Sequence, residues 1–125
     1  MKKPFYFEGT EDKPNINFDP QNNIFEMSGN SYPEESPKFY IPLISWITEY
    51  AIQPNEDTKV VCKFEYFNSL SAKLLYEVFF ALQKIGERGK KVTIEWYFHP
   101  DDHFIHEKGL EYKNVLSIPF DLIPY

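Results

Sequence analysis

The sequence has few of the residues that mark a secreted or membrane-bound chain. Its 125 residues include one cysteine, Cys62, which excludes an intrachain disulfide and suits a reducing cytosol. Cys62 lies in an apolar run, so we expect its thiol to be buried and unreactive. No apolar run reaches the length of a signal peptide or a transmembrane helix. We therefore expect a soluble, cytoplasmic chain with no membrane partner.

Positive charge and glycine are also scarce. The chain has 13 Lys and Arg against 19 Asp and Glu, a formal net charge of −6, whereas nucleic acids are bound by clustered Lys and Arg. With five glycines it has no glycine-rich phosphate loop and no G-x-S-x-G turn. An S-x-x-K motif ending at Lys73 fails because position 70 is Leu70. These absences argue against nucleic-acid binding and against kinase, nucleotide hydrolase and serine hydrolase activity.

Aromatic residues, by contrast, make up 18% of the chain. A chain of this length and hydrophobic content buries one sizeable core. We therefore expect residues 1–125 to form a single packed domain, with residues 1–14 as a loose lead-in.

The first half of the chain predicts a hairpin followed by a helix. Two short apolar segments, 16–18 and 24–27, flank a turn at 19–23. The next loop ends in Ser36, the expected N-cap of the helix, and Pro37, its expected first residue.

One stripe of that helix is apolar, and a proline interrupts its second turn. We expect Pro42 to bend the helix or delay its start. The stripe consists of Phe39, Leu43, Trp46, Ile47 and Tyr50.

The second half predicts a strand at 59–67, a long helix at 69–88 and a strand at 92–99. A short helix is expected from Pro100 and a last strand at 115–120. In the strand at 59–67 we expect Val60, Cys62, Phe64 and Tyr66 to share one face, and Val61, Lys63, Glu65 and Phe67 to share the other.

This order predicts the fold class. A strand–helix–strand unit implies a parallel pair with a right-handed crossover. Polar side chains such as Lys63 and Glu95 line one face of the two strands, so that face cannot be fully covered. We expect an α/β (α+β-like) domain with a small mixed sheet and helices packed mainly on one face.

The junction Asn68-Ser69-Leu70-Ser71 begins the long helix. At about 100° per residue, Ser71 falls on the sheet-facing arc, whereas Ser69 points away from the sheet. We expect Ser71 to be a capping or buried group and Ser69 to be exposed. The sheet-facing arc also holds Leu70, Leu74, Leu75, Val78, Ala81, Leu82 and Ile85, and the outward stripe holds Lys73, Tyr76 and Phe80.

A helix N-terminus favours an anion, and a phosphate on Ser69 would lie one turn from Lys73. The alternative is that Asn68 or Ser69 is only an N-cap and Lys73 only a solvated side chain. These residues alone leave both interpretations open.

Three motifs stand out along the chain: SYPE (Ser31, Tyr32, Pro33, Glu34), FNSLSAKLL (67–75) and IEWYF (94–98). Together they resemble the SiaC family of small bacterial regulatory phosphoproteins. The similarity runs from about Gly9 to the end of the chain. It implies a STAS-like fold, similar to that of anti-anti-sigma factors.

The resemblance also implies a partner-switching function without enzymatic activity or a cofactor. In the family, a serine/threonine kinase phosphorylates a hydroxyl at the helix start and a metal-dependent phosphatase removes the phosphate. The unmodified form binds and activates a diguanylate cyclase, which promotes cyclic di-GMP synthesis and biofilm formation. The acceptor position matches Ser69, with Ser71 as the fallback, although the family has threonine then serine where this chain has Ser69 then Leu70.

We expect the partner surface to combine the helix stripe with the SYPE loop. Exposed aromatics are common interface anchors, which favours Tyr76 and Phe80. The expected contacts on the helix side are Asn68, Lys73, Tyr76 and Phe80, and those on the loop side are Ser31, Tyr32, Pro33 and Glu34. The alternative for SYPE is an ordinary loop leading into a helix.

Two other functions remain open from the sequence. One is a structural scaffold that is never phosphorylated. The other is a metal-dependent enzyme that uses the cluster HPDDHFIHE (His99 to Glu107), where His103 and His106 lie one turn apart. Zinc signatures demand a tighter pattern, and Asp101 and Asp102 also suit a helix start, so we expect no metal site.

Overall fold

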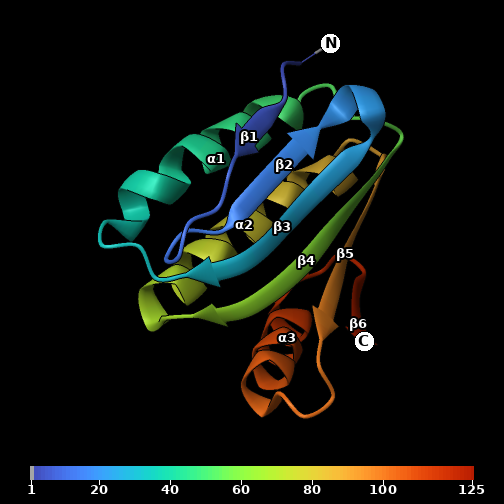
Figure 1. The fold of residues 1–125 in the computed structure, drawn as a ribbon. Coiled ribbons are helices and arrows are strands. Elements are labelled where there is room, and N and C mark those ends of the chain that lie inside the picture. Colours follow the sequence, from blue (N-terminus) through green and yellow to red (C-terminus); the bar gives the residue numbers. More distant parts are fainter. Residues whose placement is uncertain (1) are drawn as a thin grey trace.

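The computed structural model describes residues 2–125, which form one mixed sheet and three α-helices (Figure 1). The elements in order are β1 (Phe5–Phe7), β2 (Asn15–Asp19), the 3-10 helix η1 (Pro20–Asn22), β3 (Ile24–Ser31), α1 (Ser36–Tyr50), β4 (Asp57–Phe67), α2 (Ser69–Glu87), β5 (Lys91–Phe98), α3 (His103–Val115) and β6 (Phe120–Pro124). None of these helices is long and apolar enough to cross a membrane.

The six strands lie side by side in sequence order. β1, β2 and β3 pair antiparallel, and the hairpin predicted around residues 19–23 is confirmed. β3, β4, β5 and β6 then pair in parallel, with α1, α2 and α3 as the three connections. The predicted strand–helix–strand unit is thus β4–α2–β5.

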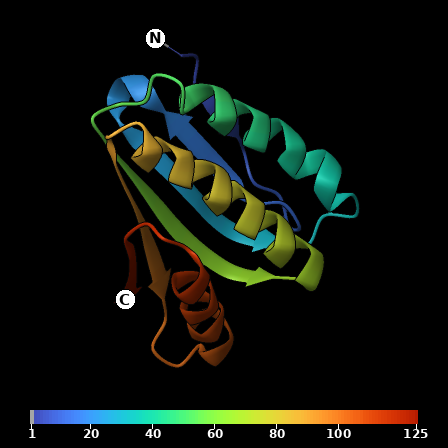
Figure 2. The same cartoon turned by 180° about the vertical axis from the view of Figure 1, so that it is seen from behind.

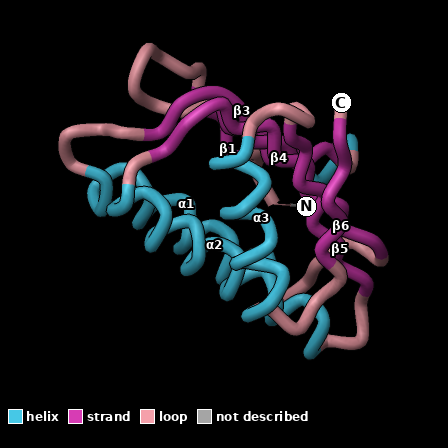
Figure 3. The backbone as a smooth tube through the Cα atoms, turned by 90° about the horizontal axis from the view of Figure 1, so that it is seen from below, coloured by secondary structure: helices cyan, strands magenta, loops and turns pink. Residues whose placement is uncertain are grey.

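All three helices cover the same face of the sheet (Figures 2 and 3). On that face Phe18 of β2 packs against Trp46 of α1, with ring centroids 5.8 Å apart. Trp96 of β5 packs against Phe79 of α2 at 6.2 Å and against Tyr112 of α3 at 5.5 Å. The opposite face keeps charged side chains in water, so the predicted mixed sheet with one covered face is confirmed.

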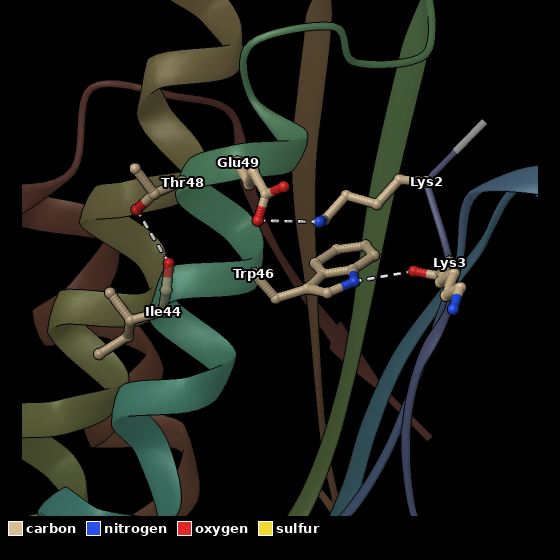
Figure 4. A network of polar contacts seen from close by, with 6 residues as sticks. All are labelled: Lys2, Lys3, Ile44, Trp46, Thr48 and Glu49. Carbon is tan, nitrogen blue, oxygen red and sulfur yellow. Dashed lines mark hydrogen bonds and ion pairs between the residues drawn. The ribbon is translucent and has the colours of Figure 1, made fainter.

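The N-terminal segment is not a loose lead-in, which corrects the sequence prediction. β1 pairs with β2, and the indole Nε1 of Trp46 donates a 2.8 Å hydrogen bond to the carbonyl oxygen of Lys3 (Figure 4). The Nζ of Lys2 lies 3.1 Å from a carboxylate oxygen of Glu49, also on α1. A three-residue strand is too short to produce a readable alternation, so these long-range contacts were invisible in the sequence. Met1 lies outside the described residues.

The start of α1 differs from the prediction by one residue. Ser36 is the first helical residue, and the N-cap position belongs to Glu35, whose side chain makes no capping hydrogen bond. The Ser36 hydroxyl instead donates to the carbonyl oxygen of Pro33 at 3.1 Å. Pro42 lies inside the helix and does not delay its start. Of the predicted stripe, Phe39 is half-buried, and its neighbour Tyr40 occupies the fully buried position.

The C-terminal boundaries also shift along the chain. α3 begins at His103 rather than near Pro100, because the Asp102 carboxylate accepts a hydrogen bond from the Ile105 backbone N–H at 3.1 Å and so acts as the N-cap. Val115 is the last residue of α3, and the final strand runs over Phe120–Pro124 instead of 115–120.

A β-bulge near the end of β4 changes which side chains face the helices. Gly29 of β3 pairs with Phe64 and Asn30 pairs with Tyr66, so Glu65 is an extra residue. The alternation therefore slips by one: Phe67 is fully buried and Tyr66 is 47% exposed. The prediction that Tyr66 faces inward and Phe67 outward was wrong for this reason.

Trp96 lies at the centre of the core between α2, α3 and β6. It is fully buried, and its indole N–H donates to the carbonyl oxygen of Ile105 at 3.0 Å. Gly109 of α3 faces this ring closely: a Cβ built there would lie 2.6 Å from the Cδ1 atom of Trp96 and 2.7 Å from a methyl of Leu122. Close packing of α3 therefore needs glycine at position 109.

We predict that Gly109→Ala lowers the free energy of unfolding by about 1–3 kcal/mol, because the added methyl overpacks the Trp96 site. Gly86→Ala is the matched control. Its Cβ would meet nothing closer than 4.0 Å, and alanine is the better helix former by up to about 1 kcal/mol. Urea denaturation of both variants measures the effect, and equal stability of the two would contradict the packing argument.

Candidate functional site

Asn68 sets the point at which α2 begins. Its side-chain oxygen accepts a 2.9 Å hydrogen bond from the backbone N–H of Ser71, and its own backbone N–H donates to the carbonyl oxygen of Ser31 at 3.1 Å. The first of these bonds makes Asn68 the N-cap, where the sequence had left the choice between Asn68 and Ser69 open. As a result Ser69 is the first residue of the helix.

The helix phase places Ser69 on the outside of the molecule. Ser69 and Lys73 are exposed, and the rings of Tyr76 (36% exposed) and Phe80 (52% exposed) stack with centroids 6.2 Å apart. The structure therefore brings these four side chains into one outward stripe, as the helical wheel predicted. Leu70 differs, because it lies at the edge of the predicted sheet-facing arc and is 45% exposed.

Ser71, the fallback acceptor, has the opposite environment. Its side chain is fully buried, and its hydroxyl oxygen accepts a 2.9 Å hydrogen bond from the Ser31 hydroxyl. The burial expected from the wheel is confirmed. A hydroxyl in this position is closed to another enzyme while the domain is folded, whereas the Ser69 hydroxyl is accessible.

The SYPE residues divide into an exposed pair and a buried pair. Tyr32 (37% exposed) and Glu34 face solvent, whereas Ser31 and Pro33 are buried. The expectation that Ser31 and Pro33 present their side chains to a partner is corrected. Ser31 ends β3, and its hydroxyl contacts Tyr40 of α1 and Ser71 of α2, so its side chain points into the helix-covered face.

Two exposed aromatic residues that the sequence interpretation missed continue from Tyr32 in a row. The ring of Tyr66 is 6.0 Å from that of Tyr32 and 5.6 Å from that of Phe104, measured between centroids. We call these three side chains the aromatic row. Strand alternation predicts a buried Tyr66, because the bulge that turns it outward cannot be read from the sequence. Phe104 lies between His103 and His106, in the segment that was interpreted only as a candidate metal site.

A small hollow separates the aromatic row from the tip of α2. Its volume is about 90 Å³, and it is lined by Tyr66, Phe67, Asn68, Ser69, Ala72, Phe104 and Lys108. Lys108 on α3, which the sequence interpretation missed, is a second cation of the region besides the predicted Lys73. Its Nζ lies 3.6 Å from a carboxylate oxygen of Glu111 and 5.9 Å from the centre of the Phe104 ring.

Cys62 and the histidines of segment 99–107, the other candidate reactive groups of the sequence, pack within the fold. Burial raises the pKa of the Cys62 thiol far above its ordinary value, which makes the thiol unreactive as expected. In the segment 99–107, His99 stacks on Tyr125 at 4.4 Å and His106 stacks on Phe98 at 4.5 Å. Across residues 2–125 no three His, Cys, Asp or Glu side chains gather in a way that could hold a metal ion.

Fold and site together define a small α/β domain that exposes one serine at a helix N-terminus, between aromatic rings and two lysines. Such a surface suits a protein that other proteins recognise and modify. A profile described as SiaC family regulatory phosphoprotein matches residues 7–125, and the chain belongs to this family.

Relatives at low sequence identity share the whole domain. An uncharacterized protein of Pseudomonas aeruginosa strain UCBPP-PA14 is 24% identical over 115 residues, which are 92% of this chain and 91% of that protein. Crystalline apo-SiaC of Pseudomonas aeruginosa matches with a TM-score of 0.87 at 24% identity, covering 98% of this chain and 99% of that one. SiaC also matches, as the activator in a complex with the diguanylate cyclase SiaD, with a TM-score of 0.88 at 23% identity, covering 97% of this chain and 99% of that one.

We predict that Asn68→Ala destabilises the domain by about 1 kcal/mol, because the N–H of Ser71 loses its side-chain acceptor. Asn68→Asp keeps an acceptor oxygen and adds a negative charge where the helix dipole favours one, so it retains wild-type stability or exceeds it. Urea unfolding followed by circular dichroism separates the two variants. Equal losses for both would show that the cap does not contribute.

Proposed function

We propose that this chain is a partner-switching regulator that is reversibly phosphorylated on Ser69. Its unmodified form binds and activates a diguanylate cyclase, and so promotes cyclic di-GMP synthesis and biofilm formation. A cognate serine/threonine kinase adds the phosphate and a metal-dependent phosphatase removes it. The observation that carries this proposal is the exposure of Ser69 at the tip of α2, inside a surface of aromatic rings.

Family membership and the solved SiaC–SiaD complex support the choice of partner. SiaC of Pseudomonas aeruginosa is the activator of a diguanylate cyclase, and its fold extends over nearly all of this chain. A cyclase and a kinase both consume nucleoside triphosphates, so the proposed setting is the cytoplasm.

In the unmodified state we assign the docking contacts to exposed side chains on both sides of Ser69. Tyr76 and Phe80 on α2 offer large apolar surfaces, and Tyr32 extends the surface across the strand ends. Rigid aromatic anchors of this kind supply most of the binding energy in protein interfaces. Asn68 and Glu34 add polar contacts at the edge, and Lys73 lies within the stripe.

Phosphorylation of Ser69 makes the partner-free state of this surface more favourable than the partner-bound state. A phosphoserine carries a charge of about −1.5 to −2 at pH 7, which the N–H groups at the start of α2 and the Lys73 ammonium one turn on stabilise in water. Lys108 lines the small hollow that Ser69 also borders, and its ammonium group adds a second cation near the phosphate. Under a docked partner the same dianion is desolvated among aromatic rings, at a cost that releases the partner.

We predict that Ser69→Ala retains binding to the cyclase and resists phosphorylation, whereas Ser69→Asp loses at least about tenfold in affinity, an effect of about 1.4 kcal/mol. Calorimetric titration against the purified cyclase measures the affinity. Ser45→Asp, at an exposed position on α1, adds the same charge elsewhere and binds as the wild type does. The proposal fails if Ser69→Asp and Ser45→Asp bind equally well, or if phosphopeptide mass spectrometry of protein from its own cells finds no phosphate on Ser69.

Single alanine substitutions at Tyr76 and Phe80 should each weaken cyclase binding about tenfold or more, since both are exposed anchors. Neither change removes buried core, so thermal stability stays close to wild type. Ile52→Ala is the control, because Ile52 is 58% exposed but follows the far end of α1. Competition binding with the labelled wild-type chain measures all three variants. Losses as large for Ile52→Ala as for Tyr76→Ala would place the interface elsewhere.

A further inference from the structure

Four buried hydroxyl groups meet beneath the tip of α2. They belong to Ser31 at the end of β3, Ser36 and Tyr40 on α1, and Ser71 on α2, and none of the four residues is exposed to solvent. No function assigned above uses them. Buried hydroxyls cost free energy unless each one is paired, so their grouping calls for a physical reason.

The hydrogen bonds among the four hydroxyls run in a single direction. Ser31 donates to Ser71 at 2.9 Å, and Ser36 donates to the carbonyl oxygen of Pro33 at 3.1 Å. Each hydroxyl has only one proton to donate. The 2.5 Å contact between Tyr40 and Ser31 is therefore donated by Tyr40, and the 3.5 Å contact between Ser71 and Ser36 by Ser71.

The resulting chain, which we call the hydroxyl relay, runs from Tyr40 through Ser31, Ser71 and Ser36 to the Pro33 carbonyl. Burial raises the pKa of the Tyr40 phenol well above its ordinary value, so the first donor keeps its proton. Within residues 2–125 no buried side-chain nitrogen or oxygen lacks a hydrogen-bond partner. A relay that is fully paired and runs one way is cooperative, and it fixes one arrangement of the segments that it joins.

The relay joins the two separate parts of the docking surface. Ser71 lies in the first turn of α2, two residues after Ser69. Ser36 and the Pro33 carbonyl hold the loop that presents Tyr32 and Glu34. Outside the β3–β4 ladder, one backbone bond among the described residues 2–125 joins the start of α2 to this region, from the Asn68 N–H to the Ser31 carbonyl oxygen at 3.1 Å, and it reaches the strand end rather than the loop.

We propose that the hydroxyl relay couples the tip of α2 to the loop 32–35, so that the two segments open and close together as one docking surface. Tyr40 and Ser71 are then positioning residues, which act on a partner only through the segments that they hold. The consequence for partner switching rests on the function proposed above, but the mechanical coupling does not.

Amide hydrogen exchange on the full-length chain, read by mass spectrometry, tests the coupling without any partner. Ser71→Ala removes the middle of the relay and leaves the Ser31 proton without its acceptor. We expect exchange to become about tenfold faster at the hydrogen-bonded amides of both segments, that of Tyr32 in the first and those of Ser71 and Ala72 in the second, because the open state of both gains population. Tyr40→Phe removes only the first donor, keeps the ring volume and gives the same pattern with a smaller change.

Tyr50→Phe is the matched control. Tyr50 is a second buried tyrosine of α1, and its hydroxyl pairs with that of Thr58 at 2.8 Å and accepts from the Asn55 N–H at 3.0 Å. Its loss speeds exchange around residues 53–58 and leaves the loop 32–36 and the α2 tip unchanged. The coupling is overturned if Ser71→Ala and Tyr40→Phe speed exchange in one segment alone, or if Tyr50→Phe speeds both segments equally.

The functional consequence is measured separately, at a temperature at which all variants are folded. Tyr40→Phe weakens binding to the purified diguanylate cyclase about threefold to tenfold, whereas Tyr50→Phe does not change it. Wild-type affinity in Tyr40→Phe overturns the role of the relay in docking. A wild-type chain that neither binds the cyclase nor accepts phosphate refutes the proposed function instead, and the exchange pattern still decides whether the coupling exists.

Discussion

The site depends on the hydrogen bond between the side-chain oxygen of Asn68 and the backbone N–H of Ser71. This bond fixes the residue at which α2 starts, and the start fixes which side chains face the sheet for the following five turns. A helix that began one residue later would turn every position by about 100°. Ser69 would leave the surface stripe, and Phe79 would lose its place against Trp96. The cap and the packing of the buried arc thus favour the same helix phase, and that phase presents Ser69 to solvent.

The one-sided architecture explains why the proposed docking surface lies at one edge of the sheet. In a parallel sheet the carboxyl ends of the strands meet at one edge, where α/β proteins commonly place their binding sites. Here β3 ends at Ser31, and the loop 32–35 leads from it into α1. The neighbouring strand β4 ends at Phe67, and Asn68 caps the start of α2. Residues about 40 positions apart thus become neighbours, which the Ser31–Ser71 hydrogen bond shows directly.

Much of the fold was predictable from the sequence because strong periodicities carry it. α2 was predicted within about one residue, since its apolar arc repeats over 19 residues and its cap is a standard asparagine. The parallel β4–β5 pair and the single covered face followed from alternation with charged residues. Ser69 was placed on the exposed side by the same wheel that buried Ser71.

Features that depend on distant partners could not be predicted in this way. β1 exists because it pairs with β2 and contacts α1, and its three residues carry no signal of their own. The burial of Ser31 and Pro33 depends on where α1 and α2 begin, which local sequence does not reveal. Leu70 was predicted to face the sheet because a helical wheel treats every position on the arc as equally covered by neighbouring residues. At the first turn of a helix fewer residues lie alongside, so Leu70 stays exposed.

The bulge at Glu65 has a further consequence for how this surface can evolve. The bulge lets β4 carry one residue more than its pairing with β3 needs. A lineage that loses the Glu65 codon would restore regular pairing and still leave the tyrosine outward and Phe67 inward, because Asn30 and Ser31 already pair with these two residues. Strand length can therefore change at this one point while the same rings stay exposed.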